Sequence, residues 1–87
     1  YSKIDANNYI FDGKITIKDF CKVLEDTNEE KFEEYKGESE TIAGFILEIS
    51  GKFPKIGEKI NFDRYTFTIE ALDRKRIKQL KVTRHYE

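Results

Sequence analysis

YTFTIEA, residues 65–71, is the stretch that decides the fold of this chain. Its large apolar side chains alternate with threonine and glutamate, so an extended backbone presents one apolar face and one polar face. The residues before and after it, Asp63-Arg64 and 73–75, are typical of tight turns. We therefore predict a half-buried strand at 65–71 that has a neighbouring strand on each side in the sequence.

The two neighbouring strands are shorter and less regular. Ile60 and Phe62 alternate before the first turn, and Leu80 and Val82 alternate after the second. Ile77 is out of step with the latter pair, so the last strand either contains a β-bulge or begins after Ile77. The last third of the chain is thus predicted to be an antiparallel unit of three strands.

Two amphipathic helices are predicted upstream of this unit. Each has apolar residues at the spacing i, i+3, i+4 and i+7, which lines one helix face: Ile17, Phe20, Cys21 and Leu24 in the first, and Ile42, Phe45, Ile46 and Ile49 in the second. Thr16 followed by Asp19 resembles a capping box, and Thr41 can cap the second helix. Gly51 stands just beyond the second helix, where a left-handed residue is favoured.

A short strand at 9–11 and a turn at Asp12-Gly13 precede the first helix. The predicted order is strand, helix, loop, helix and three strands. This order favours the α+β class, with a small, mostly antiparallel sheet and two helices on one face. The 87 residues form one domain, because two cores would not fit. We predict a linker or frayed terminus at 1–8 and a single domain at 9–87.

Charge is unevenly distributed, although the formal net charge is only −1. Residues 25–40 contain eight acids and two bases, and their only large apolar residues are Phe32 and Tyr35. We interpret this stretch as a long loop with at most a marginal helical turn. Residues 74–84 contain six bases and no acid. They are interpreted as a solvated strand face or as a partner for acidic or lipid surfaces.

Few residues of this chain suggest chemistry. His85 is the only histidine, and Cys21 lies on the apolar face of the first helix, where packing is the favoured role. The glycines are scattered and form no phosphate-binding loop. We therefore predict that the chain is not an enzyme, has no catalytic residues and holds no cofactor. Nucleic acid is not expected as a partner, because the pI is about 5.9.

The acidic stretch also contains the candidate ligands for a divalent cation, since carboxylate oxygens are what Ca²⁺ and Mg²⁺ prefer. These candidates are Glu29, Glu30, Glu33 and Glu34. Their spacing matches no EF-hand loop, and charge runs are usually solvated. A solvated, mobile loop is therefore the favoured interpretation, and a divalent-ion sensor is retained as an alternative.

Three stretches resemble the CorC/HlyC transporter-associated domain: DGKITIKDF at 12–20, TIAGFIL at 41–47 and GKFPKIGE at 51–58. The C-terminal part agrees at Phe62, Tyr65-Thr66-Phe67, Arg76-Ile77 and Lys81-Val82-Thr83. The resemblance extends from Tyr9 to Arg84 and rests on the order and spacing of these motifs. The Lys-, Phe- and Tyr-rich character and Asp19-Phe20-Cys21 are most similar to the Bacteroidetes branch that includes gliding-motility-associated members.

This resemblance implies the cytoplasmic C-terminal domain of an integral membrane protein, located behind a transmembrane domain and a pair of CBS domains at the inner membrane. Proteins of this kind are described as haemolysin-like or as magnesium and cobalt efflux proteins. The chain has no methionine, which agrees with a piece of a longer protein. We therefore expect a non-catalytic regulatory or assembly module that modulates transport.

The resemblance also implies two further expectations. The fold is grouped with a FAD-binding superfamily, so a flavin- or adenine-nucleotide-binding module is an alternative, although the sequence lacks a Gly-rich pyrophosphate loop. The family has no agreed catalytic residues, so none is carried over. A homodimer is a further expectation, because the core is thin and the last strand is expected at a sheet edge.

Overall fold

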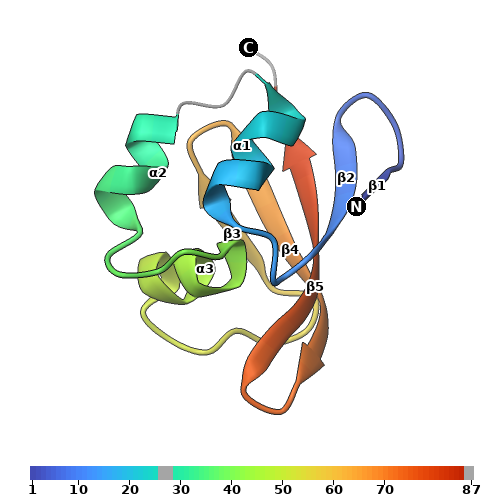
Figure 1. The fold of residues 1–87 in the computed structure, drawn as a ribbon. Coiled ribbons are helices and arrows are strands. Elements are labelled where there is room, and N and C mark those ends of the chain that lie inside the picture. Colours follow the sequence, from blue (N-terminus) through green and yellow to red (C-terminus); the bar gives the residue numbers. More distant parts are fainter. Residues whose placement is uncertain (26–28, 86–87) are drawn as a thin grey trace.

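A computed structural model describes residues 1–25 and 29–85 of the chain. Its strands form one antiparallel sheet in the order β1-β2-β5-β4-β3. Their bounds are β1 Ser2–Lys3, β2 Asn8–Asp12, β3 Lys59–Phe62, β4 Tyr65–Asp73 and β5 Arg76–Arg84. The helices are α1 Ile17–Leu24, α2 Glu29–Tyr35 and α3 Ile42–Ser50. Figure 1 shows the helices gathered on one face of the sheet. The predicted α+β class is confirmed, with three helices on that face where two were expected.

The last strand lies in the middle of the sheet. β5 pairs with β2 on one side and β4 on the other, so that Leu80 lies opposite both Phe11 and Ile69. The expectation of an edge position is therefore wrong. The N-terminal strand β2 returns to pair with β5, and this pairing buries Tyr9 and Phe11 on the core face. The edges are β1 and β3.

The irregularity near Ile77 is a bulge inside β5, as one of the two sequence alternatives predicted. The β4–β5 register shifts between the pair Ile69 with Leu80 and the pair Leu72 with Ile77. Beyond this shift the two strands continue as a hairpin that projects past the helices (Figure 1). A bulge bends and twists a strand locally, which is consistent with the different direction of the projecting hairpin.

The starts of α1 and α3 are joined to each other. Thr16 Oγ1 accepts a hydrogen bond from Asp19 N, and Thr41 Oγ1 accepts one from Gly44 N, both at 3.1 Å. The first backbone amide of each helix donates a hydrogen bond to the residue that precedes the cap of the other helix. Ile17 N donates to Glu40 O, and Ile42 N donates to Ile15 O, both at 2.9 Å. Both predicted threonine caps are confirmed, and the mutual bonds satisfy donors that a helix start leaves open.

The core is aromatic and lies between the helices and the sheet. Phe20 of α1 packs on Phe11 of β2 with ring centroids 5.0 Å apart and on Phe67 of β4 at 6.0 Å. Phe45 of α3 completes the layer at 6.4 Å from Phe67. Cys21 is 7% exposed and belongs to this core, as its place on the helix face predicted.

The expectation of a long loop with at most a marginal helical turn at 25–40 is wrong, because Glu29–Tyr35 forms the seven-residue helix α2. Phe32 is its buried residue. The Phe32 ring lies 4.9 Å from the ring of Phe45 and 5.0 Å from that of Phe62. A single anchor leaves no apolar periodicity, which explains why the sequence pattern did not indicate a helix. Residues 26–28 of the stretch lie outside the described residues.

The first residues differ from the predicted linker or frayed terminus at 1–8. Ser2 pairs with Ile10 and Lys3 with Tyr9, which adds a short edge strand to the sheet. The turn that follows is held by Asp5, whose carboxylate accepts hydrogen bonds from the backbone of Asn7 at 2.8 Å and from the side chain of Asn8. Hydrogen bonding to the charged form favours it, so these bonds, the one from Asn7 first, lower the pKa of Asp5.

Candidate functional site

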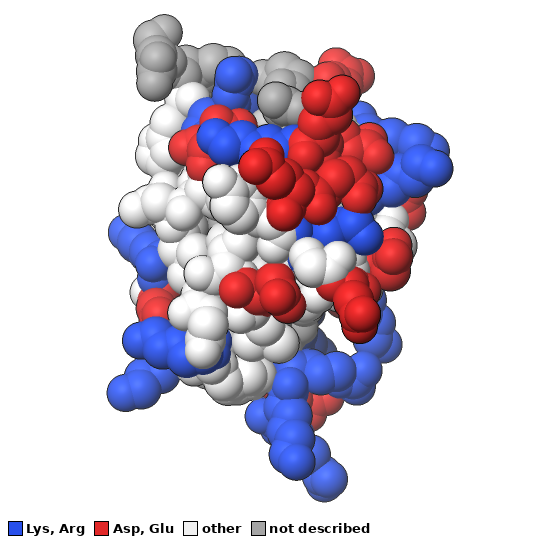
Figure 2. Space-filling model, turned by 90° about the vertical axis from the view of Figure 1, so that its left-hand side faces the viewer, with Lys and Arg blue, Asp and Glu red and all other residues white. Residues whose placement is uncertain are grey.

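The four candidate metal ligands all lie on α2, and all are exposed. On the face drawn in Figure 2, acidic side chains gather at the upper end of the molecule. Glu33 is engaged with Lys36, whose Nζ lies 3.6 Å from Glu33 Oε2 and 3.4 Å from Glu40 Oε1. Within residues 1–25 and 29–85, no three His, Cys, Asp or Glu side chains come close enough together to hold a metal ion.

An open groove of about 700 Å³ runs between α2, the end of α3 and β3. Its walls include Tyr35, Glu48 and Phe62. Lys31 lies across it, with Nζ 3.3 Å from Asp63 Oδ1 and 5.7 Å from the centre of the Phe62 ring. The groove thus combines carboxylates and aromatic rings, and an ammonium group of the chain itself already occupies part of it.

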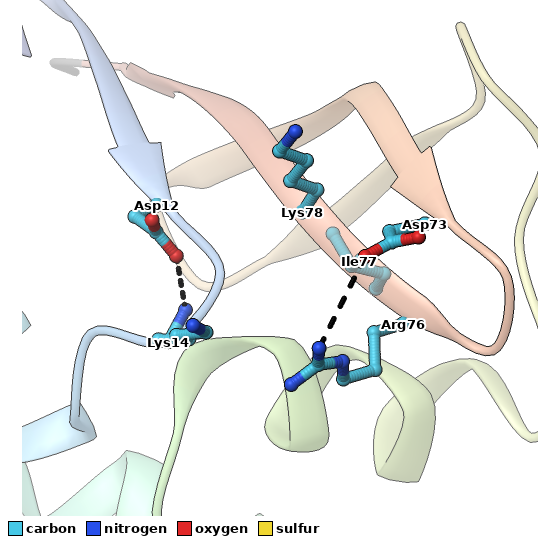
Figure 3. A pocket seen from close by; sticks show the side chains of 6 residues that line it. All are labelled: Asp12, Lys14, Asp73, Arg76, Ile77 and Lys78. Carbon is cyan, nitrogen blue, oxygen red and sulfur yellow. Dashed lines mark hydrogen bonds and ion pairs between the residues drawn. The ribbon is translucent and has the colours of Figure 1, made fainter.

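A smaller cavity of about 100 Å³ lies where β2 ends beside the start of β5 (Figure 3). Two carboxylates and three bases surround it, and each carboxylate already has a partner. Asp12 Oδ1 accepts a hydrogen bond from Lys14 N at 2.8 Å, and Asp73 Oδ2 lies 4.0 Å from Arg76 Nη2. Pockets for drug-sized ligands usually measure about 300–1,000 Å³. This cavity suits water or a small ion, and a nucleotide does not fit inside it.

The basic stretch 74–84 does not form one surface, because Arg84 is structural. Its side chain donates to Leu24 O at 3.1 Å and to Ala6 O at 3.2 Å, and its guanidinium lies 5.7 Å from the centre of the Tyr9 ring. It therefore ties the end of α1, the N-terminal turn and β5 together. Sequence reasoning missed this role. The sequence did contain a signal for it: Arg84 follows Leu80 and Val82 at a spacing of two residues. Side chains at that spacing point to the same face of a strand, so Arg84 lies on the core side.

The remaining bases of the stretch separate by location. Lys81 lies within β5, opposite Ile10 of β2 and Thr68 of β4, on the outer face of the sheet. Arg74, Lys75 and Arg76 lie at the turn of the β4–β5 hairpin and are exposed. Figure 2 shows basic side chains projecting at the lower end of the molecule, away from the acidic upper end.

The outer face of the sheet is polar and internally bonded. Thr83 Oγ1 donates to Asn8 Oδ1 at 2.7 Å. Thr66 Oγ1 donates its single proton to Asn61 Oδ1 at 2.6 Å, so the 2.7 Å contact with His85 Nε2 has the histidine as donor. His85 is thus held on the outer face of the sheet.

Cys21 lies on the opposite side of the sheet from His85, among the core residues. Burial, with the nearby carboxylates of Glu29 and Glu33 acting in the same direction, raises the pKa of the Cys21 thiol from 9.0 to about 11. A thiol with this pKa is protonated at neutral pH, and the thiolate is the nucleophilic form. The two residues therefore do not form a nucleophile–base pair.

The chain matches a known family over nearly its whole length. The family model for CorC_HlyC, described as a transporter associated domain, matches residues 2–85 of the chain. This chain belongs to that family. The resemblance seen in the motifs is confirmed, whereas the gliding-motility branch stays a prediction. In the described part of this transporter associated domain, no helix is long and apolar enough to cross a membrane.

Two of the relatives that the chain resembles are named as export proteins. It is 36% identical over 82 residues to a polyamine export protein of Salmonella typhimurium, a match that covers 92% of this chain and 17% of the relative. It is 39% identical over 46 residues to the magnesium and cobalt efflux protein CorC of Buchnera aphidicola, covering 53% of this chain and 16% of that protein. The domain therefore spans about a sixth of the length of these relatives.

A solved structure supports the same family. The transporter associated domain from a CBS domain protein of Porphyromonas gingivalis has a TM-score of 0.82 and 28% sequence identity, and the match covers 97% of both chains. The antiparallel sheet with helices on one face is therefore the family fold. It also occurs there as part of a protein that contains CBS domains.

Proposed function

We propose that this domain is a non-catalytic regulatory or assembly module of a cation-exporting membrane protein, located on the cytoplasmic face of the inner membrane. The observation that carries the proposal is the match of 92% of the chain to 17% of a polyamine export protein. A small domain that is one part of a long exporter acts through the rest of that protein. The parent's transmembrane and CBS domains are its proposed partners.

The exported cation is a polyamine or a divalent metal ion, because the matched relatives are named for these two classes. The core arrangement agrees with a role in modulation rather than chemistry. Cys21 is packed and protonated, His85 is engaged on the other side of the sheet, and the cavity beside β2 is small. None of these features supplies an activated nucleophile.

The test is deletion of residues 9–84 from the full-length parent, followed by measurement of putrescine, Mg²⁺ and Co²⁺ export and of oligomer size. We expect export or assembly to change, since the module acts on the rest of the protein. A matched control is Tyr35→Ala in the full-length protein, which alters a half-exposed side chain and keeps the fold. Unchanged export together with unchanged oligomer size would refute the proposal.

The alternative of a flavin- or adenine-nucleotide-binding module rests on the superfamily resemblance and stays a prediction of lower rank. A visible absorption spectrum of the purified domain and a calorimetric titration with FAD and ATP test it. Our expectation is a colourless protein and no binding heat. Bound flavin, or saturable heat with either ligand, would contradict that expectation and favour the alternative.

The alternative of a divalent-ion sensor concerns the four glutamates of α2. Their charges repel one another, so any cation raises stability somewhat by screening. We expect MgCl₂ and NaCl at equal ionic strength to shift the melting temperature equally. A shift specific to Mg²⁺ that disappears on changing Glu29, Glu30, Glu33 and Glu34 to Gln would instead establish the sensor.

A further inference from the structure

The hairpin between β4 and β5 places several bases on a convex end of the molecule. Arg74, Lys75 and Arg76 are exposed at its turn, and the exposed Lys14 and Lys78 line the cavity beside it. The turn also carries Asp73, which pairs weakly with Arg76 at 4.0 Å. Figure 1 shows the hairpin projecting beyond the helices, and Figure 2 shows blue side chains extending from that end.

Many of the acidic residues lie at the other end of the molecule, whereas Asp12 and Asp73 lie at the hairpin end. The glutamates of α2 lie in the acidic area at the top of Figure 2, and the basic side chains project at the bottom. The net charge of −1 therefore conceals a strong charge separation. The molecule is 32 Å long, whereas the Debye length is about 10 Å at 0.1 M salt. At this salt concentration, the repulsion between the acidic end and an anionic surface that touches the hairpin is consequently largely screened.

A second segment at the same end carries exposed apolar side chains. The connector between α3 and β3 lies near the hairpin end in Figure 1. Phe53 is 42% exposed and Ile56 64% exposed, and each follows a lysine within two residues, Lys52 and Lys55. Lys52 Nζ lies 3.8 Å from Glu58 Oε2. Apolar side chains interspersed with lysines are typical of segments that bind the interface of an anionic membrane.

The shape of this end favours a broad surface over a small ligand or a peptide. The bases stand on a projecting turn, where Asp73, Arg74, Lys75 and Arg76 line a shallow, open hollow of about 320 Å³, and the cavity beside it measures about 100 Å³. An anionic surface can contact several separated bases at once, and it does not need a pocket that surrounds it. Clusters of four to eight Lys or Arg residues close to a membrane are a recognised basis for binding anionic lipids.

We propose that the β4–β5 hairpin, together with the connector 52–56, docks on the anionic lipid headgroups of the membrane that holds the parent protein. The inference rests on the proposed function for the presence of that membrane. Docking through this end leaves the acidic helix α2 pointing away from the bilayer. The lipid charge then fixes how the domain is oriented beneath the membrane.

A second copy of the chain is the main rival occupant, because the acidic end of one copy could meet the basic end of another. Such a contact joins different surfaces of the two copies, head to tail. Repeating it produces an open filament unless the rotation between neighbouring copies closes a ring. Nucleic acid is the other rival. Both are included as outcomes of the experiment.

The test is co-sedimentation of the purified 87-residue domain with phosphatidylcholine vesicles prepared with and without phosphatidylglycerol. We expect binding to the anionic vesicles that weakens as salt is raised. Because a base near an anionic surface contributes about fivefold to binding, Arg74→Gln with Lys75→Gln should weaken binding about 25-fold. The matched control, Lys18→Gln with Lys22→Gln, removes the same charge from exposed positions on α1 and should leave binding unchanged.

Four results would overturn the docking proposal. They are equal binding to neutral vesicles, no binding to either vesicle, equal loss in the two double variants, and tighter binding to duplex DNA than to anionic vesicles. Sedimentation of the domain without lipid provides a fifth, since self-association that the hairpin variant abolishes would establish a second copy as the occupant. Circular dichroism of both variants confirms that each remains folded.

The outcome is separable from that of the proposed function, because vesicle binding requires no parent protein. If domain deletion alters export but vesicles do not bind, only the docking is refuted. If vesicles bind but deletion leaves export and assembly unchanged, only the regulatory role is refuted.

Discussion

At the scale of single residues, the atoms close to two glycines limit which side chains fit there, and the surroundings of one cysteine change its pKa. Gly13 donates its amide to Lys78 O at 2.9 Å, so the end of β2 lies directly against β5. At Gly44 an added Cβ would lie against the side chains of Ser39 and Thr41. Burial in the core raises the pKa of the Cys21 thiol and so makes it a weaker acid.

Gly13→Ala should lower the free energy of unfolding by about 3 kcal/mol, because the added Cβ overlaps the carbonyl oxygen of Ile77. The matched control is Gly51→Ala, where φ is +71° but no atom lies within 4 Å of the new Cβ. That change should cost only about 1 kcal/mol. Urea denaturation measures both, and an equal cost for the two variants would contradict the close approach at Gly13.

The Cys21 thiol should make the stability of the domain fall as the pH rises from about 9 to about 11. In this interval the folded protein retains the thiol proton while the unfolded chain releases it, so unfolding is favoured by at most about 1.4 kcal/mol per pH unit. Cys21→Ala removes this contribution. Urea denaturation of both proteins across this pH interval isolates it, and parallel curves would contradict the raised pKa.

At the scale of elements, α1, α3 and β4 are supported by several residues each, whereas α2 depends on one. The apolar faces of α1 and α3 recur at helical spacing, and their threonine caps are joined through mutual hydrogen bonds. α2 instead presents charged residues on its remaining sides and inserts Phe32 between the other helices and β3. An element held in this way is expected to open before the rest of the structure.

Phe32→Ala should destabilise the domain by about 3–5 kcal/mol, the usual cost of removing a buried aromatic ring. Amide hydrogen exchange should accelerate first in α2 and only later in β5, because the anchor of α2 is lost. Tyr35→Ala is the control on the same helix, since that ring is 49% exposed and packs edge-on against Phe62 at the rim of the core. Equal destabilisation by the two changes would show that Phe32 is not the anchor.

At the scale of the whole molecule, the order of strands makes the C-terminus indispensable. β5 provides the pairing surface for both β2 and β4, while β1 at the edge pairs through two residues only. The side chains of Asn8 and Thr83, 75 positions apart, bond to each other across this junction. The predicted homodimer by pairing of the last strand loses its structural basis, and dimerisation by other surfaces stays a prediction that sedimentation can test.

Truncation after Lys75 should abolish folding, because β2 and β4 then have no common partner and the core loses Ile77, Leu80 and Val82. Removal of residues 1–4 should be tolerated with a cost of about 1–2 kcal/mol, in line with a few lost hydrogen bonds. Circular dichroism during thermal unfolding compares the two. A cooperative transition in the first variant would contradict the central role of β5.

The sequence alone determined the α+β class, the two capped helices, the alternation at 65–71 and an irregularity near Ile77, because each depends on the periodicity of nearby residues. Only the tertiary structure decided that the irregularity is a bulge, that β5 is central and that Glu29–Tyr35 is a helix. It also separated Arg84, which is structural, from the exposed bases at the hairpin turn. Periodicity shows which side of an element is apolar. It does not show which distant segment covers that side, since this is settled by pairing across the length of the chain.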